Sequence, residues 1–261
     1  NMEDITFRSA NILKKSDLIL CEDTRRSLKL LSHLQIKNKL LACHKFNEKK
    51  VSEKIVNLIN ENKIVSLISD AGTPTISDPG ILLVNKCIEK NINVYPIPGP
   101  SAVTSAISVS GFTDKYLFYG FLKKKENELN NELKKIQNLN YSIVFFVPAS
   151  KINFYISKFK EFFFDRKILI AKEMTKIHEN YIRNHVSLIK NLPDNFKGEL
   201  TIVLSEKIGD KKNKEIINES VKVEIKKMLK KYSHKDVVDF ISKKENLSKK
   251  IIYNFCLKLK K

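Results

Sequence analysis

The sequence predicts an α/β fold with a mostly parallel first sheet, a second α/β unit with a mixed sheet, and a helical tail. Short apolar, β-branched runs alternate with amphipathic helical patterns through the first 110 residues, as expected for strand–helix–strand crossovers. Loops rich in Gly, Pro and Asp follow several of these runs. Apolar residues make up 42% of the 261 residues, which is enough for each unit to bury a core.

The first part of the chain reads as helices and short strands in turn. Expected strands are residues 18–21, 39–43, 64–68 and 93–97. Expected helices are residues 3–15, the segment carrying Leu28, Leu31 and Leu34, the segment carrying Val51, Ile55, Leu58 and Ile59, and residues 81–90 and 101–110. Gly111 is a plausible residue just beyond the last of these helices.

After Gly111 the spacing of the pattern changes. Expected strands are residues 116–121, 142–147, 168–171 and 200–204, with a charged helix over 123–138 and another helix after the second strand. From Gly209 the chain is Lys-rich, and two short amphipathic helices flank residues 243–248. They resemble a helix-turn-helix, although a small helical cap fits equally well. We expect three domains: 1–111, 112–207 and 208–261.

The loop from Ser69 to Gly80 is the most distinctive stretch. It follows the buried strand 64–68 and holds two Gly, two Pro and two Asp in twelve residues. Ligands bind at the carboxyl ends of strands in open α/β sheets, and Gly lets the backbone approach a ligand closely. A long turn that only caps the next helix, with Ser77 or Asp78 as N-cap, explains the composition equally well.

Three loops at strand ends are expected on one edge of the sheet: 22–26, 70–80 and 98–102. Acidic and small residues dominate them. The sequence has no phosphate-binding loop with its Lys, no nucleophile elbow and no pair of histidines with metal-ligand spacing. These absences disfavour P-loop NTPases, α/β hydrolases and zinc enzymes, and leave a pocket for a small polar ligand.

The net charge of +19 favours a polyanionic partner such as RNA. Lysine supplies most of this charge, and Asn and Ile are also abundant, so a biased nucleotide composition of the genome explains part of it. The four cysteines are far apart, which fits reduced thiols in the cytoplasm. No apolar run is long enough to span a membrane and no signal peptide is visible.

Several motifs in the right order resemble the ribosomal RNA small subunit methyltransferase I family. They are NMEDITFRSA, CEDTRR, SDAGTPTISDPG, PIPGPSA, the segments 171–176 and 197–200, and the Lys-rich tail. This family belongs to the tetrapyrrole methylase superfamily. The resemblance therefore implies a two-domain, tetrapyrrole-methylase-like (class III S-adenosylmethionine methyltransferase) fold.

The resemblance implies a function and a set of contacts. Family members transfer a methyl group from S-adenosylmethionine to the ribose 2′-oxygen of a decoding-site cytidine in 16S rRNA, as homodimers, and no metal is implied. The implied donor-binding residues are Asp70, Ala71, Gly72, Thr73, Ile76, Ser101, Ala102, Val147 and Met174. The tail is expected to bind RNA through Lys243, Lys244, Lys249 and Lys250. The expected partner is the 30S subunit, with no membrane and no DNA.

Methyl transfer to a ribose hydroxyl requires alignment and an acceptor for the hydroxyl proton. Glu22 and Asp23, at the end of the strand beside the donor loop, are the candidate bases, and Arg25 is the candidate to orient the acid or hold a phosphate. A helix start with an acid at its N-cap explains the same residues without chemistry.

Two departures from the family pattern stand out. The family normally begins with a strand and a Pro-Ile-Gly-Asn turn, of which Asn1 matches the last residue, so we expect weak or no donor binding by a chain lacking that strand. The family also has Glu-Ser and then His-Arg near 147–151, where this chain has Val147, Pro148, Ser150 and Lys151. These departures leave two alternatives to an rRNA methyltransferase: a small-molecule methylase of the same superfamily, and an RNA-binding module without catalysis.

Overall fold

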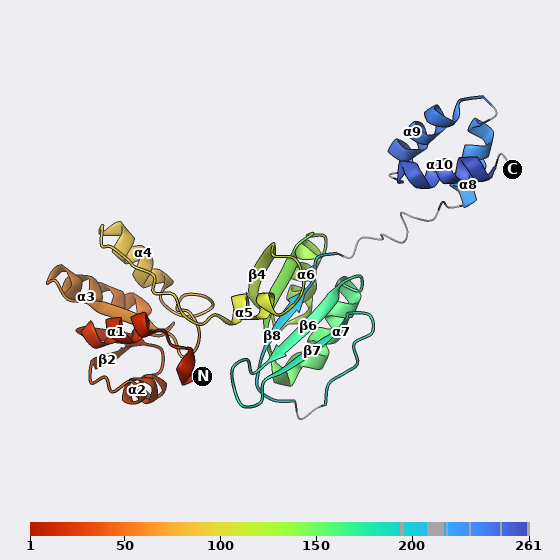
Figure 1. The fold of residues 1–261 in the computed structure, drawn as a ribbon. Coiled ribbons are helices and arrows are strands. Elements are labelled where there is room, and N and C mark those ends of the chain that lie inside the picture. Colours follow the sequence, from red (N-terminus) through yellow and green to blue (C-terminus); the bar gives the residue numbers. More distant parts are fainter. Residues whose placement is uncertain (194–195, 208–216, 218, 230, 246, 260–261) are drawn as a thin grey trace. The chain divides into compact units, whose positions relative to one another are not determined.

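The structure is a computed structural model that describes residues 1–193, 196–207, 217, 219–229, 231–245 and 247–259 (Figure 1). It divides into two compact units, Asn1–Lys207 and Ile208–Lys261. The first unit holds both sheets, and the described helices of the second unit form a separate helical body.

The first sheet is parallel and has the strand order β2-β1-β3. Its strands are β1 (Leu18–Cys21), β2 (Lys39–Ala42) and β3 (Val65–Ile68). Cys21 at the end of β1 pairs in register with Ile68 at the end of β3. The loops that follow these two strands therefore start side by side, as the alternating sequence pattern predicts.

Helices cover this sheet in sequence order. They are α1 (Phe7–Lys15), α2 (Thr24–His33), α3 (Glu48–Asn60) and α4 (Ile81–Glu89), after a 3₁₀ turn at Met2–Asp4. The next helix, α5 (Ala102–Ser108), packs on the second sheet instead. The expected helix 3–15 begins only at Phe7, because the Thr6 hydroxyl accepts a hydrogen bond from the Ser9 N–H and caps it. One core packs α3 and α4 around Leu20, and another packs α1 and α2 around Ile19.

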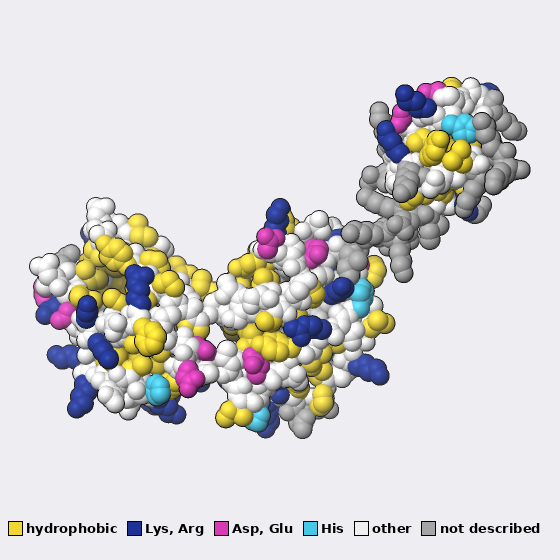
Figure 2. All heavy atoms as spheres, in the orientation of Figure 1, with side chains coloured by type: hydrophobic (Ala, Val, Ile, Leu, Met, Phe, Trp, Pro, Cys, Tyr) yellow, Lys and Arg dark blue, Asp and Glu magenta, His cyan; other side chains and the backbone are white. Residues whose placement is uncertain are grey.

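The strand expected over residues 93–97 does not form. In the described part of the chain β3 pairs with β1 alone, and residues 93–97 add no strand at its open edge. Val94 and Tyr95 are exposed at 48% and 74%. They add to the apolar surface of this half of the first unit, where Ile81, Leu82 and Ile88 of α4 are also exposed (Figure 2).

The second sheet is mixed and has the order β4-β5-β8-β6-β7. Its strands are β4 (Tyr116–Phe121), β5 (Ser142–Pro148), β6 (Lys167–Lys172), β7 (Asn180–His185) and β8 (Glu199–Leu204). Only β4 and β5 are parallel; the other neighbours are antiparallel. Strand β7 is not among the strands expected from the sequence, because this edge strand is mostly polar and lacks an apolar run.

Both faces of the second sheet are covered. Helices α6 (Glu126–Ile136) and α7 (Ile152–Phe162), the latter preceded by a 3₁₀ turn at Ala149–Lys151, pack on one face through Leu129, Leu133 and Phe159. On the other face, Val103 and Ala106 of α5 pack against alternate strand residues. Successive residues of each strand point to opposite faces of the sheet, as the two-residue period of a strand requires.

A buried arginine joins three segments at one end of this sheet. Arg166 is 0% exposed and donates through Nη1 to the carbonyls of Tyr141 and Ser205, and through Nη2 to those of Gln137 and Leu139. Its guanidinium also lies over the Phe163 ring. A buried charge is tolerated here because carbonyl oxygens replace its hydration.

The second unit contains α8 (Glu219–Met228), α9 (His234–Glu245) and α10 (Lys249–Lys258). They share their own core, built on Val221, Ile225, Val237, Ile241 and Ile252. Helices α9 and α10 match the two amphipathic helices expected from the sequence, and they pack on each other around the junction at residues 246–248. Residue 246 of that junction lies outside the described residues. No helix in the described ranges has the length and apolar character needed to cross a bilayer.

Candidate active site

The edge formed by the ends of β1 and β3 carries the candidate site. The backbone N–H of Asp23, just after β1, donates to the Asp70 carboxylate at 3.2 Å, just after β3. The same carboxylate pairs with Arg26 at 3.4 Å. Asp70 is thus a link between two of the three loops that the sequence predicted on one edge, and the structure brings these loops together.

The loop from Ser69 to Gly80 also contacts the third predicted loop. The Thr73 hydroxyl donates to the carbonyl of Pro100 at 3.1 Å. Within the loop, the Ser69 hydroxyl donates to the carbonyls of Ala71 and Gly72 at 3.0 and 3.1 Å. These bonds hold the exposed backbone of residues 71–73 in one shape against the segment that precedes α5.

Three residues of this loop have left-handed backbone conformations. Gly72 has φ +72°, Thr75 has φ +70° and Ser77 has φ +68°. Non-glycine residues rarely adopt this region, and such strain gathers at ligand-binding sites. A Cβ on Gly72 meets only the Pro100 carbonyl, at 3.8 Å, so the position needs glycine for its backbone angle rather than for space.

Asp23 and Arg25 are paired with each other. The Asp23 side chain accepts from the Arg25 backbone N–H at 2.9 Å and from the Arg25 guanidinium at 3.1 and 2.8 Å. The hydrogen bonds from Arg25 lower the pKa of Asp23 to about 2. Asp23 is therefore the N-cap of α2, as the alternative interpretation of this motif held, and Arg25 is occupied by it.

Asp78 is a residue whose role sequence reasoning missed. Its half-buried position raises its pKa to about 6, and the nearby charges of Glu22, Asp70 and Glu199 add to this rise. A carboxyl with a pKa near neutrality is suited to exchange protons. The sequence suggested Ser77 or Asp78 as N-cap of the next helix, but the N-cap is Gly80 and the capping carboxylate comes from Glu48. The sequence signal that could have indicated the raised pKa of Asp78 was the number of acidic residues in the loops at this edge of the first sheet.

The remaining predicted donor contacts lie in different settings. Ser101 caps α5 through its hydroxyl, beside Ala102 at the start of that helix. Val147 is 2% exposed and packs in the core under α6 and α7. Met174, in the loop after β6, packs with the core on the opposite face. Ile76 is exposed at 43% in the first loop.

The predicted RNA-binding lysines of the tail are only partly described. Lys244 pairs with Glu224 at 2.6 Å, and Lys249 pairs with Asp239 at 2.5 Å. The side chains of Lys243 and Lys250 lie outside the described residues. Lysines and arginines on the face of the first unit shown in Figure 2 are spread out rather than gathered in one patch.

Known proteins resemble the chain in both sequence and fold. The family profile of Tetrapyrrole (Corrin/Porphyrin) Methylases matches residues 1–189. The fold is similar to the crystal structure of the methyltransferase CobJ, with a TM-score of 0.59 and 13% identity over 78% of this chain and 89% of that one. It is also similar to the uroporphyrin-III-C-methyltransferase from Thermus thermophilus, with a TM-score of 0.54 and 14% identity over 78% of this chain and 88% of that one.

Sequence relatives narrow the family. The ribosomal RNA small subunit methyltransferase I of Thermotoga maritima is 43% identical over 79% of this chain and 94% of its own length. The proteins of the same name from Mesomycoplasma conjunctivae and Bacillus subtilis are 42% and 34% identical over 82% and 78% of this chain, and 91% and 71% of their own lengths. The resemblance read from the motifs is confirmed: the chain belongs to the ribosomal RNA small subunit methyltransferase I family of tetrapyrrole methylases.

Proposed function

We propose that this protein is a methyltransferase that uses S-adenosylmethionine to methylate the ribose 2′-oxygen of a decoding-site cytidine in 16S rRNA. The observation that carries the proposal is the identity of 34–43% to relatives named ribosomal RNA small subunit methyltransferase I, over about four fifths of the chain. The net charge of +19 supports an RNA substrate over a small tetrapyrrole.

The chemistry of the loops fits S-adenosylmethionine. This donor presents a sulfonium cation, an ammonium, a carboxylate, a ribose diol and an adenine. The exposed backbone of Ala71, Gly72 and Thr73 offers N–H and carbonyl groups for the polar parts. The carboxylates of Asp70, Glu22 and Asp78 complement a cationic ligand and the diol. Ser101, Ala102, Ile76, Met174 and the backbone of Val147 complete the proposed donor-binding set.

The donor supplies the methyl group, and the chain's own residues have to align the ribose hydroxyl and accept its proton. The proposed acceptor is a carboxylate of the edge. Asp23 is poorly suited, because its pKa of about 2 and its pairing with Arg25 make it a weak base. Glu22 and Asp78 remain, and burial, with the nearby charge of Glu22 adding to it, raises the pKa of Asp78 to about 6. We assign the proton to this pair, with Asp23 and Arg25 positioning the start of α2.

We further propose three domains at 1–111, 112–207 and 208–261, a homodimeric assembly, and a tail that binds RNA. The separate core of α8, α9 and α10 supports an independent tail. The methyl donor is expected to sit against the loops of the first domain, and the 30S subunit is the expected substrate.

Two measurements test the proposed function. Titration calorimetry of the full-length protein with S-adenosylmethionine is expected to give a one-to-one complex, and the absence of heat excludes a methyltransferase. Transfer of labelled methyl groups to unmethylated 30S subunits is expected to place one label on a ribose of 16S rRNA. Label on a base, or on a small tetrapyrrole in place of RNA, contradicts the proposed substrate.

A further inference from the structure

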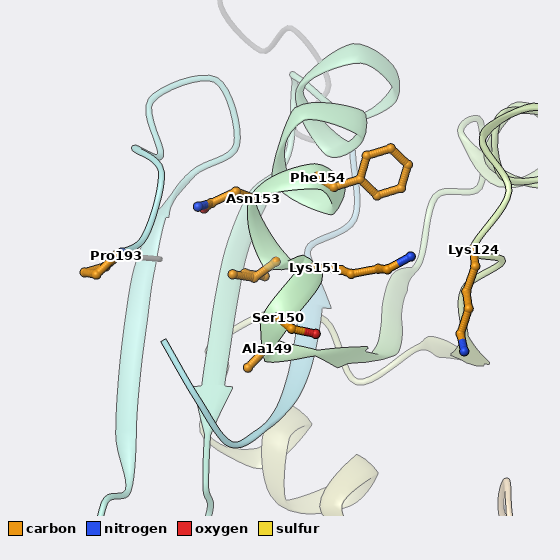
Figure 3. A pocket seen from close by; sticks show the side chains of 8 residues that line it. Lys124, Ala149, Ser150, Lys151, Asn153, Phe154 and Pro193 are labelled. Carbon is orange, nitrogen blue, oxygen red and sulfur yellow. The ribbon is translucent and has the colours of Figure 1, made fainter. Parts of the chain in front are cut away.

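A cavity of about 400 Å³ lies at the carboxyl end of β5, where the chain turns into α7 (Figure 3). Its wall is formed by Lys124, Ala149, Ser150, Lys151, Ile152, Asn153, Phe154 and Pro193. Lys124 comes from the connection between β4 and α6, and the 149–154 segment comes from the start of α7. This cavity lies outside the loops assigned above to the donor.

The cavity has a positive character. In Figure 3 the Lys151 side chain extends toward the segment that carries Lys124. Both side chains are exposed, and neither belongs to an ion pair within the described residues. No acidic residue lines the wall. Asn153 is already used, because its amide exchanges two hydrogen bonds with the backbone of Leu192 and so fixes the wall near Pro193.

An aromatic ring adds to this character. Helix α7 continues directly from the 3₁₀ turn at Ala149–Lys151, and the N–H of Ile152 donates to the Ala149 carbonyl, so the two ammonium groups are the charged groups that the wall offers to an anion. Phe154 lies on the same side of the helix as Lys151 in Figure 3 and is only partly buried, against Tyr155. Cations beside an aromatic face are the combination that binds a phosphate and its neighbouring base in single-stranded nucleic acid.

The acidic edge of the first sheet makes a separate phosphate site necessary. Burial raises the pKa of Asp78, and the nearby charges of Glu22 and Asp70 add to this rise. The negative charge gathered at this edge also repels a phosphodiester. An RNA substrate that delivers a ribose to this edge therefore needs its backbone held by cations elsewhere.

We propose that the cavity between Lys124, Lys151 and the start of α7 binds a phosphodiester group of the substrate RNA, with an adjacent unpaired base against Phe154. This inference rests on the proposed function, since it assigns a position to the RNA of that reaction. In the segment 147–151, which departs from the family pattern, Lys151 would then contact the RNA.

The test compares two double variants of the full chain. Lys124→Gln with Lys151→Gln removes both cavity cations, and Lys134→Gln with Lys135→Gln removes two exposed lysines of α6 that line no described cavity. Binding to unmethylated 30S subunits is measured over a range of salt concentrations. The cavity variant is expected to weaken binding about fivefold to tenfold and to reduce the salt slope by about 0.7, the value for one phosphate contact of a single strand. The α6 variant is expected to change affinity less than twofold.

A third variant tests the base contact. Phe154→Leu keeps an apolar side chain but removes the stacking face, and it is expected to weaken RNA binding at least fivefold while the melting temperature and S-adenosylmethionine affinity stay close to those of the original chain. Equal effects of the two lysine pairs, or an unchanged affinity of Phe154→Leu, overturn the inference.

The outcomes separate this inference from the proposed function. If the original chain methylates 30S subunits and the cavity variants bind RNA normally, the function stands and the inference is wrong. If the original chain binds RNA through the cavity but transfers no methyl group, the inference stands and the function is wrong. In an active chain, the cavity variants are expected to raise KM for 30S subunits and leave kcat unchanged at saturating RNA.

Discussion

The carboxylate of Glu48, at the start of α3, accepts a hydrogen bond from the backbone N–H of Gly80 at 2.9 Å. The same oxygen accepts from the N–H of Leu82 at 2.7 Å. Gly80 has no side chain to cap α4, so a buried acid 32 residues earlier in the chain satisfies the first turn of that helix. The end of the Ser69–Gly80 loop is thereby fixed to α3.

Replacement of Glu48 tests this link. Glu48→Ala leaves the N–H groups of Gly80, Leu82 and Leu83 without this acceptor at the start of α4, and we expect it to lower the free energy of unfolding by about 2 kcal/mol. Denaturant unfolding measures the change. Glu53→Ala, an exposed position on the same helix, is the control and is expected to stay within about 0.5 kcal/mol. Equal effects of the two substitutions contradict the capping role.

Gly72 is expected to be required for donor binding. Its φ of +72° disfavours any side chain, so Gly72→Ala should lower stability by about 1 kcal/mol and Gly72→Val by more, with S-adenosylmethionine binding abolished in the valine variant. Calorimetry measures the affinity. Gly99→Ala is the matched control, because a Cβ there meets nothing within 4 Å and its φ is ordinary. Donor affinity that survives Gly72→Val means that the loop only connects β3 to α4.

Asp78 gives a pH dependence of stability with a definite sign. Its folded-state pKa of about 6 lies above its usual value of 3.8, so the folded state favours the protonated carboxyl. The penalty is absent below about pH 3.8, grows as the pH rises through the interval to about 6, and is complete above it. Asp78→Asn is thus expected to match the original chain at pH 3.5 and to exceed it by about 1 kcal/mol at pH 7, after allowance for its partial exposure.

The measurement for Asp78 is the difference between the two unfolding curves at several pH values, which cancels the titration of the other groups. Glu89→Gln, at the exposed end of α4, is the control and should give a difference that does not vary with pH. A constant difference for Asp78→Asn as well means that the pKa of Asp78 is not raised in the folded state.

The tail lysines are expected to contribute unequally to RNA binding. Neutralising Lys243, Lys244, Lys249 and Lys250 together should weaken binding and reduce its salt slope by about one unit for each lost phosphate contact. Lys244 and Lys249 are already paired with Glu224 and Asp239. Because these pairs must break before a phosphate binds, Lys244→Gln with Lys249→Gln should reduce the slope by less than about two units, the reduction expected for two unpaired lysines. An unaltered slope in the fourfold variant reduces the tail to a packing element.

Much of the fold could be predicted from local pattern. The apolar runs at β1, β3 and β5 are fully determined by period and flanking turn residues, and these strands formed within a residue of the expected bounds. The local sequence pattern gave wrong strand predictions where pairing with a neighbouring strand decides whether a segment forms a strand. Residues 93–97 have strand composition without a partner strand, whereas the polar β7 is a strand because β6 is beside it. A strand depends on its neighbour, which lies elsewhere in the sequence.

The candidate site shows the same division. The meeting of the loops after β1 and β3 follows from parallel register, and sequence order alone predicts it. The pairing of Asp23 with Arg25, the cap from Glu48 and the raised pKa of Asp78 depend on distances between side chains that composition does not encode. The sequence therefore predicts the edge, but not which side chains contact one another there.

The four carbonyls held by Arg166 give the second sheet two unlike ends. Arg166 binds these carbonyls near the start of β5, and the cavity lined by Lys124 and Lys151 lies at the end of β5. One end is cross-braced by a single guanidinium, so the strands there cannot splay without exposing four oxygens and a charge. The opposite end lacks this arginine, so we expect the lysine substitutions proposed there to change RNA binding with little effect on folding.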